Sequence, residues 1–203
     1  MPTPIGHTLA ALTIASAVRT GGRPSGVQYY ALAAVLGCLP DIELAIELMV
    51  GNGARLHQGP MHSFGFAAAL ALVLVAVAHR AGNRAIPFFL FAFGCLASHP
   101  LLDSLRSFEG PRAGIPLLWP FSSRPYELPW HIFGHSPGLS MLGDSEALRV
   151  VLLNVGVELV VLLPFVAFTF GLRRLQSRRK WGGPNRVTRN LSARSDTPRS
   201  AEA

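Results

Sequence analysis

Nine histidine and carboxylate side chains lie inside or at the borders of the apolar blocks of this 203-residue chain. An ionisable group in such surroundings costs free energy and is therefore a candidate for function. Imidazole nitrogens and carboxylate oxygens together are ligands that zinc, manganese and iron accept in proteins. The group consists of His7, Asp41, Glu43, Glu47, His57, His62, His99, Asp103 and Glu158.

His99 and Asp103, in the segment SHPLLDS, are separated by one helical turn if the helix continues through Pro100. An imidazole and a carboxylate on one helix face can hold the same metal ion. Pro100 does not exclude this, because a proline in the first turn of a helical segment loses no hydrogen bond. The alternative is a hydrogen-bonded His–Asp pair at the end of a helix.

His57 and His62 lie in the segment LHQGPMHS, with Gly59 and Pro60 between them. They cannot be neighbours on a regular helix, but they can converge from a turn, with Ser63 as the N-cap of the apolar helix that follows. The alternative is a pair of solvated loop histidines.

Asp41 and His7 are embedded more deeply in apolar sequence. Asp41 follows Pro40 inside an apolar block and is costly to leave unpaired, so its alternative role is an ion pair with an arginine. His7 lies one turn into the first apolar segment, where it could also be a buried histidine with satisfied hydrogen bonds.

The elements that position these residues are apolar blocks. Half of the chain is hydrophobic and 14% is charged, which is a membrane composition. We predict an all-α fold, a polytopic membrane helical bundle of about five apolar helices, with a long irregular loop at 104–149. The expected helices cover residues 5–18, 28–50, 64–79, 85–103 and 150–172, and we expect Pro40 and Pro164 to kink two of them.

The formal net charge of +7 is carried entirely by residues 173–203. Residues 1–172 are neutral, which argues against a nucleic-acid-binding surface. We therefore predict two parts: a membrane-embedded metal-dependent hydrolase domain at 1–172 and a basic, disordered cytoplasmic tail at 173–203.

Arginine and lysine near the apolar blocks predict the orientation. With the C-terminus in the cytoplasm, nine basic residues flank the cytoplasmic helix ends and five lie on the other side. We therefore expect a multi-pass inner-membrane protein with the N-terminus outside. In this topology separate blocks deliver candidate metal ligands to the outer, periplasmic side: His7, Asp41, His57, His62, His99 and Asp103.

Four histidines and two aspartates exceed the ligands of a single zinc ion, so we expect one or two divalent ions, zinc in first place. Such sites activate water and favour hydrolysis of an ester or phosphoester, with lipid-derived esters among the candidate substrates. His131 and His135 are four residues apart on the same side. They could complete the cluster, act as acid and base, or be interfacial residues beside Trp130. Glu158 also falls in the outer half.

A resemblance adds to this pattern. The succession of His7, LPDIE, HQGPMHS, SHPLLDS and AGIPLLWPF resembles the YdjM-like family, described as LexA-binding, inner-membrane metal-dependent hydrolases, over residues 1 to about 127. The resemblance implies that His7, Asp41, His57 or His62, His99 and Asp103 bind metal and that the LLWPF segment at 117–121 lines the site. It also implies a relationship to an all-helical superfamily of zinc-dependent phospholipases C and nucleases.

The chain departs from the family pattern at three places. Gln58 stands where the family commonly has arginine, and Glu43 stands where it commonly has a second aspartate. Residues 154–158 read NVGVE, so the further His-x-x-x-Glu ligand pair of the superfamily has no match and a cluster of three metals is not expected.

Two other functions remain open. A metal-ion or proton transporter also uses buried His and Asp, but the cytoplasmic halves of the expected spans, such as LALVLVAVA and PFVAFTFGL, contain almost no polar groups. A non-enzymatic scaffold could use the basic tail to recruit an acidic partner or lipid. The expected partners are membrane lipids and a small-molecule or lipid-like substrate, whereas the sequence indicates no protein partner.

Overall fold

The computed structural model describes residues 2–20, 26–50, 58–106, 114–134 and 144–181, and within them it is helical, without a β-strand. This confirms the predicted all-α fold. Six α-helices and two short 3₁₀ helices follow one another: α1 (Pro4–Ala17), α2 (Val27–Cys38), η1 (Leu39–Asp41), α3 (Ile42–Val50), η2 (Pro60–His62), α4 (Phe64–Arg80), α5 (Ala85–Asp103) and α6 (Ser145–Trp181).

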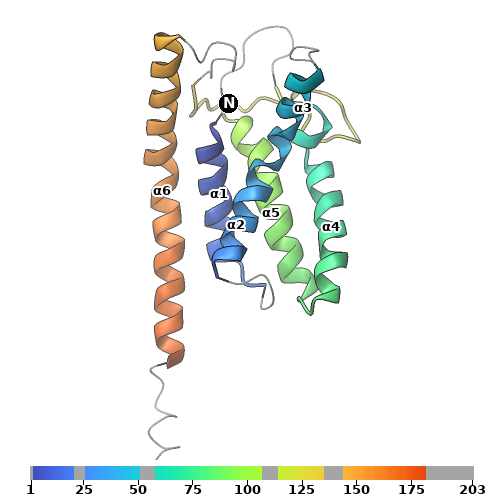
Figure 1. Ribbon diagram of the computed structural model, residues 1–203, viewed down its shortest axis with the longest axis vertical. Coiled ribbons are helices and arrows are strands. Elements are labelled where there is room, and N and C mark those ends of the chain that lie inside the picture. Colours follow the sequence, from blue (N-terminus) through green and yellow to red (C-terminus); the bar gives the residue numbers. More distant parts are fainter. Residues whose placement is uncertain (1, 21–25, 51–57, 107–113, 135–143, 182–203) are drawn as a thin grey trace, which may run out of the picture.

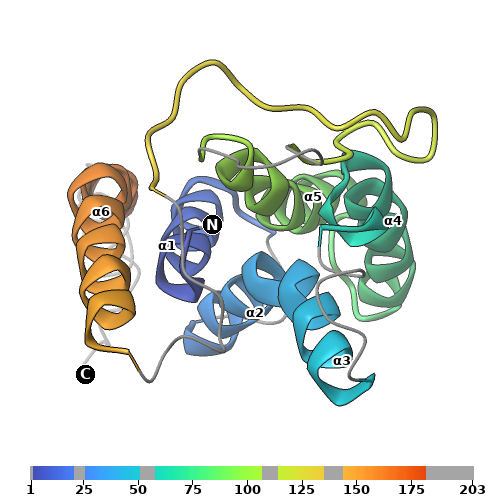
Figure 2. The same ribbon diagram turned by 90° about the horizontal axis from the view of Figure 1, so that it is seen from above.

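Neighbouring helices run up and down in a bundle (Figure 1). Helix α5 packs against α1, α2 and α4, and α1 packs against α2, α5 and α6. Seen along the bundle, α6 lies beside α1 at one edge and α4 lies at the other (Figure 2). The five predicted apolar stretches therefore correspond to the helices of one bundle.

N-capping side chains mark the start of two of these helices, α1 and α4. The Thr3 hydroxyl caps α1 by accepting a hydrogen bond from the Ile5 amide, and Pro4 occupies the first turn. The Ser63 hydroxyl caps α4 through the Phe66 amide, as predicted.

Pro40 breaks the second apolar stretch rather than kinking it. Helix α2 ends at Cys38, a 3₁₀ turn follows, and α3 starts at Ile42. Because Pro40 has no backbone N–H to donate, the α-helical hydrogen-bond pattern is interrupted here and the chain forms a 3₁₀ turn. Asp41 consequently lies in a turn between two helices. By contrast, α6 continues through Pro164 and on to Trp181, so the first residues of the predicted tail continue the helix.

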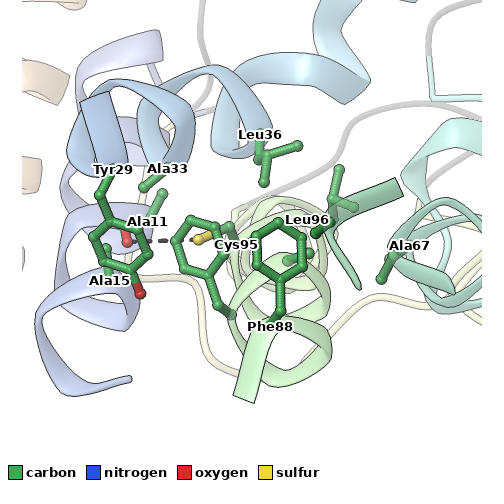
Figure 3. Close-up of a cluster of buried hydrophobic side chains, with 13 residues drawn as sticks. Ala11, Ala15, Tyr29, Ala33, Leu36, Ala67, Phe88, Cys95 and Leu96 are labelled. Atoms are coloured by element: carbon green, nitrogen blue, oxygen red, sulfur yellow. Dashed lines mark hydrogen bonds between the residues drawn. The ribbon is translucent and has the colours of Figure 1, made fainter. Parts of the chain in front are cut away.

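Small residues let the helices approach closely, as is common between membrane helices. Ala11, Ala15 and Ala33 are buried together with the rings of Tyr29 and Phe88 (Figure 3). The Cys95 thiol from α5 donates to the Ala11 carbonyl, drawn as a dashed line in the same view.

At Gly37 the approach of α2 to α1 leaves no room for a side chain. A Cβ atom at this position would lie 2.7 Å from the Ala11 Cβ and 2.9 Å from the His7 carbonyl oxygen. A glycine is therefore required where these two helices cross.

The predicted loop at 104–149 is irregular in its described part, but it ends earlier, because α6 starts at Ser145. The backbones of Ile115 and Tyr126 pair in an isolated bridge, with two hydrogen bonds of 2.8 Å. The Phe64 amide at the start of α4 donates to the Leu117 carbonyl over 2.9 Å. The loop is therefore fastened to the same end of the bundle as η1 and η2.

Within the described residues, two helices are long and apolar enough to cross a membrane, α5 over Ala85–Asp103 and α6 over Ser145–Arg178. Helix α4 is a shorter apolar helix. A polytopic helical bundle is consistent with these lengths.

Candidate metal centre

Five of the six predicted ligand residues meet at one end of the bundle. Two sets of possible donor atoms lie within 4.8 Å of one another, one from His7, Asp41 and His99, the other from His62, His99 and Asp103. These residues come from α1, η1, η2 and α5. The sixth candidate, His57, lies outside the described residues.

The donor atoms are separated by distances that suit a shared cation. The His99 Nε2 atom lies 3.4 Å from Asp41 Oδ1, 3.5 Å from Asp103 Oδ2 and 3.3 Å from His62 Nε2. The His7 Nε2 atom lies 3.6 Å from Asp103 Oδ1. Two ligands of a tetrahedral zinc ion, each bound at its usual length, lie about 3.3–3.6 Å apart. The spacing therefore fits such an ion.

Second contacts orient two of the imidazoles. The His99 Nδ1 atom lies 2.7 Å from the Gly37 carbonyl oxygen, and the His62 Nδ1 atom lies 3.1 Å from Glu43 Oε2. Each Nδ1–H therefore donates to an oxygen, which leaves each Nε2 lone pair directed at the cluster. This is how proteins commonly orient metal-binding histidines.

Glu43 is the supporting residue that the sequence did not assign. Besides His62, its carboxylate accepts hydrogen bonds from the Gly59 amide at 2.9 Å and the Met61 amide at 3.0 Å. It thus holds the whole turn that carries His62. In the sequence, Glu43 stands out only because it lies two residues after Asp41, and this position does not reveal that Glu43 contacts His62.

Burial makes the cluster incomplete without a cation. His7, His62, His99 and Asp103 have no exposed surface. Both ring nitrogens of His7, Asp41 Oδ1 and both carboxylate oxygens of Asp103 have no hydrogen-bond partner. Buried polar atoms without partners are costly and rare. A bound divalent ion would give partners to one His7 nitrogen, to Asp41 Oδ1 and to the Asp103 carboxylate, so these residues fit a metal.

His62 lies in η2, just before α4, and its environment favours positive charge. Burial lowers the pKa of His62, but the carboxylates of Asp41 and Glu43 outweigh burial and raise it to about 9. A proton and a metal ion would therefore compete for the Nε2 atom of this residue.

A buried arginine lies one turn beyond Asp103. The Arg106 amide is 3.4 Å from the Asp103 carbonyl oxygen, and the side chain is almost fully buried. Burial lowers the pKa of the Arg106 guanidinium, while Asp103, Asp41 and Glu127 act in the opposite direction. The positive charge of Arg106 therefore interacts electrostatically with the carboxylates of the cluster.

Glu158 belongs to a different contact. Its carboxylate accepts hydrogen bonds from the Thr3 amide at 2.5 Å and the Thr3 hydroxyl at 2.6 Å. A Cβ atom at Gly6 would lie 2.9 Å from the Glu158 carboxyl carbon. Glu158 thus fastens α6 to the start of α1 and is not among the grouped donors.

His131, the remaining histidine candidate within the described residues, is not brought into the cluster. His131 is half exposed and lies 3.0 Å from Glu127 Oε1, with which it forms a local pair. His135 and the side chain of Glu47 lie outside the described part of the chain. The segment at 117–121 packs on the start of α4, where a Cβ at Gly65 would overlap the Trp119 carbonyl oxygen.

The fold and the cluster define a helical membrane protein with a buried histidine–carboxylate centre. The family model for the YdjM inner membrane protein matches residues 1–179, and the chain belongs to this family. It is 32% identical over 140 residues to the inner membrane protein YbcI of Escherichia coli (strain K12), a match that covers 68% of this chain and 78% of that protein. No solved structure matches the chain. The predicted family and inner-membrane location are thereby confirmed.

Proposed function

We propose that this protein is a membrane-bound metal-dependent hydrolase that uses metal-activated water on an ester or phosphoester, with a lipid-derived molecule as the preferred substrate class. One observation carries the proposal: imidazoles and carboxylates from four separate elements converge, and five of their buried polar atoms have no hydrogen-bond partner. Packing alone gives no reason for such a costly arrangement.

The proposed ligands are His7, Asp41, His62, His99 and Asp103, with His57 a further candidate outside the described residues. His99 can bind only one ion, through Nε2, because its Nδ1–H donates a hydrogen bond to the Gly37 carbonyl. The two aspartates can each offer two oxygens, so either one or two ions can be accommodated. Nitrogen and oxygen ligands favour zinc among the common choices.

A divalent ion in this site would lower the pKa of a bound water towards neutrality and so supply the nucleophile. The chain itself supplies the positioning. Asp103 has two oxygens without hydrogen-bond partners, so one can bind metal while the other accepts a proton from a water. The positive charge of Arg106 nearby favours an anionic substrate, which supports a phosphoester over a neutral ester.

The sidedness of the centre is part of the proposal. Basic residues cluster at the helix ends opposite the candidate centre, where α1, α4 and α6 end and α5 begins (Figure 1): Arg19, Arg80, Arg84, Arg173 and Arg174. The positive-inside rule assigns that end to the cytoplasm and the centre to the periplasmic side. With Cys38 replaced by alanine, a thiol reagent confined to the periplasm should label a cysteine placed at Ser123 and leave one at Ala81 unlabelled.

Elemental analysis of detergent-purified protein tests the metal. Wild type should contain a divalent ion, whereas His99→Ala and Asp103→Ala should lose most of it, since each removes a central donor. The matched control is His131→Ala, which removes an exposed histidine paired locally with Glu127. Equal metal content in all four proteins would exclude the metal centre.

Turnover tests the hydrolase separately. Metal-loaded wild type in lipid should release product from a panel of phosphoesters, including phospholipids, and chelation should abolish the release. Re-addition of zinc should restore it. Full activity after complete removal of metal would contradict the proposed chemistry even if the ion is present.

A metal-ion or proton transporter is the second candidate, because buried His and Asp also serve transport. The cluster of buried side chains between α1, α2 and α5 is apolar and includes Ala15, Phe88, Phe91 and Ala92, and the buried polar Ser16 beside it is hydrogen-bonded to Thr169. This favours the hydrolase. Uptake of radioactive zinc into proteoliposomes at a rate above that of Asp103→Ala would reverse this preference.

A further inference from the structure

The segment at 114–134, here named the rim segment, combines a fixed backbone with exposed large apolar side chains. Phe121 is 94% exposed and Trp130 is 67% exposed, and Leu118 and Ile132 are also exposed. Exposed apolar side chains gathered on one segment indicate a surface that something covers.

Two hydrogen bonds fix the backbone of its C-terminal part to the end of α5. The Leu128 amide donates to the Ser104 carbonyl over 3.0 Å, and the Ile132 amide donates to the Leu105 carbonyl over 2.8 Å. Ser104 and Leu105 directly follow α5, one of the two helices long enough to cross a membrane. The rim segment is therefore fixed at the end of a membrane span.

Helix α6 shows how far the apolar layer reaches. Glu158 binds Thr3, so this point of α6 is level with the start of α1. Towards its N-terminus α6 continues past α1 (Figure 1), and from Glu158 to Leu148 it rises about 15 Å. Leu152 and Leu153 on this part are 62% and 61% exposed. An apolar surface of this kind on a membrane helix is covered by lipid.

A contact between the two elements places the C-terminal end of the rim segment at that same depth. A Cβ atom at Gly134 would lie 2.8 Å from the Asn154 Oδ1 atom, so the end of the rim segment touches α6. Asn154 directly follows the exposed Leu152 and Leu153. The lipid that covers these leucines consequently reaches the rim segment.

The polar residues between the aromatic ones suit the boundary between acyl chains and headgroups. Arg124 is exposed, and the Nε2 atom of His131 lies 3.0 Å from Glu127 Oε1. Tryptophan concentrates at this boundary because its ring is apolar while its N–H donates. A loop that faced only water would gain nothing by exposing the rings of Phe121 and Trp130.

We propose that the rim segment is an interfacial membrane-binding surface, with Phe121 and Trp130 inserted into the glycerophospholipid layer beside the candidate metal centre. The surface follows from the membrane location and the exposed residues, and it does not depend on hydrolytic activity. If the hydrolase proposal also holds, a lipid substrate reaches the centre from within the bilayer, since Ser104 joins the rim segment to Asp103.

Tryptophan fluorescence in proteoliposomes tests the surface. In the Trp119→Phe, Trp181→Phe protein, Trp130 is the reporter, and phospholipids brominated on the upper part of the acyl chain should quench its emission because the ring lies at the boundary. Quenching by deeply brominated lipids should be weaker. In the same Trp119→Phe, Trp181→Phe protein with Trp130→Phe and Val160→Trp, the reporter lies on the exposed face of α6 and should show the opposite order.

If Trp119→Phe disturbs folding, wild type can be compared with the Trp130→Phe protein. The part of the emission that brominated lipid quenches in wild type but not in Trp130→Phe then comes from Trp130. Quenching of Trp130 by aqueous iodide and not by brominated lipid would overturn the proposal. Emission insensitive to both quenchers, together with a dependence on the protein-to-lipid ratio, would also overturn it and indicate that a second copy of the chain covers the surface.

Discussion

At the residue scale, the candidate centre depends on contacts behind its ligands. Glu43 accepts three hydrogen bonds, from His62 and from the amides of Gly59 and Met61. One carboxylate thus sets the ring orientation of a ligand and the conformation of the turn that carries it. Gln58, which precedes this turn, has a φ of 66°, a left-handed value that is uncommon for a residue other than glycine.

Replacing Glu43 by glutamine should weaken metal binding without removing a ligand. Loss of such a supporting carboxylate typically lowers affinity by about 10–100-fold. Competition with a zinc-sensitive dye would measure the change, with Glu146→Gln at the exposed start of α6 as the control. An unchanged affinity would show that Glu43 only holds the turn.

The pKa of His62 predicts how metal binding depends on pH. Asp41 and Glu43 outweigh the effect of burial and raise this pKa to about 9, so below that pH an ion must displace a proton from His62. Metal affinity should therefore rise with pH, by about tenfold per unit for one displaced proton, and level off above pH 9. Apparent dissociation constants measured from pH 6 upwards would check this, and a flat profile would contradict it.

At the element scale, apolar block length predicted the helices, because a membrane span needs a continuous run of apolar residues. The same pattern could not show that Pro40 divides one block into α2 and α3. The contact between Glu43 and His62 also escaped prediction, since it depends on a turn with irregular backbone angles. Glu158 was expected in the outer half of its helix, which stays a prediction, and its partner Thr3 could not be foreseen because it is 155 residues away in sequence.

The crossing of α1 and α2 gives a prediction about stability. Gly37→Val should force the helices apart, because its Cβ would meet Ala11 and the His7 carbonyl. A cost of about 1–3 kcal/mol is typical of such overpacking. Thermal unfolding in detergent would report it, and metal content should fall as well, because the Gly37 carbonyl orients His99.

Gly156→Ala in α6 is the matched control for Gly37. A Cβ atom there meets no atom within 4 Å. The variant should be neutral or more stable by about 1 kcal/mol, since alanine is the better helix former. Equal effects of the two substitutions would mean that the crossing tolerates a side chain.

At the scale of the whole molecule, α6 is attached to α1 by polar contacts near both ends of α1, and the Ser16 hydroxyl of α1 also donates to the Thr169 hydroxyl of α6. Glu158 binds Thr3 near one end, and near the other end Arg173 donates to the Ala15 carbonyl at 3.2 Å and to the Tyr30 hydroxyl at 2.7 Å. The candidate centre joins residues of α1, η1, η2 and α5. Together these contacts involve every described α-helix except α3 and α4, and Glu43 of α3 reaches the centre through its contact with His62.

Removal of metal should lower the stability of the whole bundle. A ligand present at 100 times its dissociation constant stabilises the native state by about 2.7 kcal/mol. The midpoint of thermal unfolding should therefore fall on chelation and recover on addition of zinc. Asp103→Ala should show no such response, whereas His131→Ala should respond like wild type. An identical midpoint with and without chelator would indicate that no ion contributes.

The distribution of the candidate ligands along the chain also constrains biogenesis. His7, Asp41 and His62 leave the ribosome early, but His99 and Asp103 are at the far end of α5. Translation must pass residue 103 before a complete coordination shell can form. Loading of a cation would therefore follow the synthesis of the first five α-helices, α1 to α5.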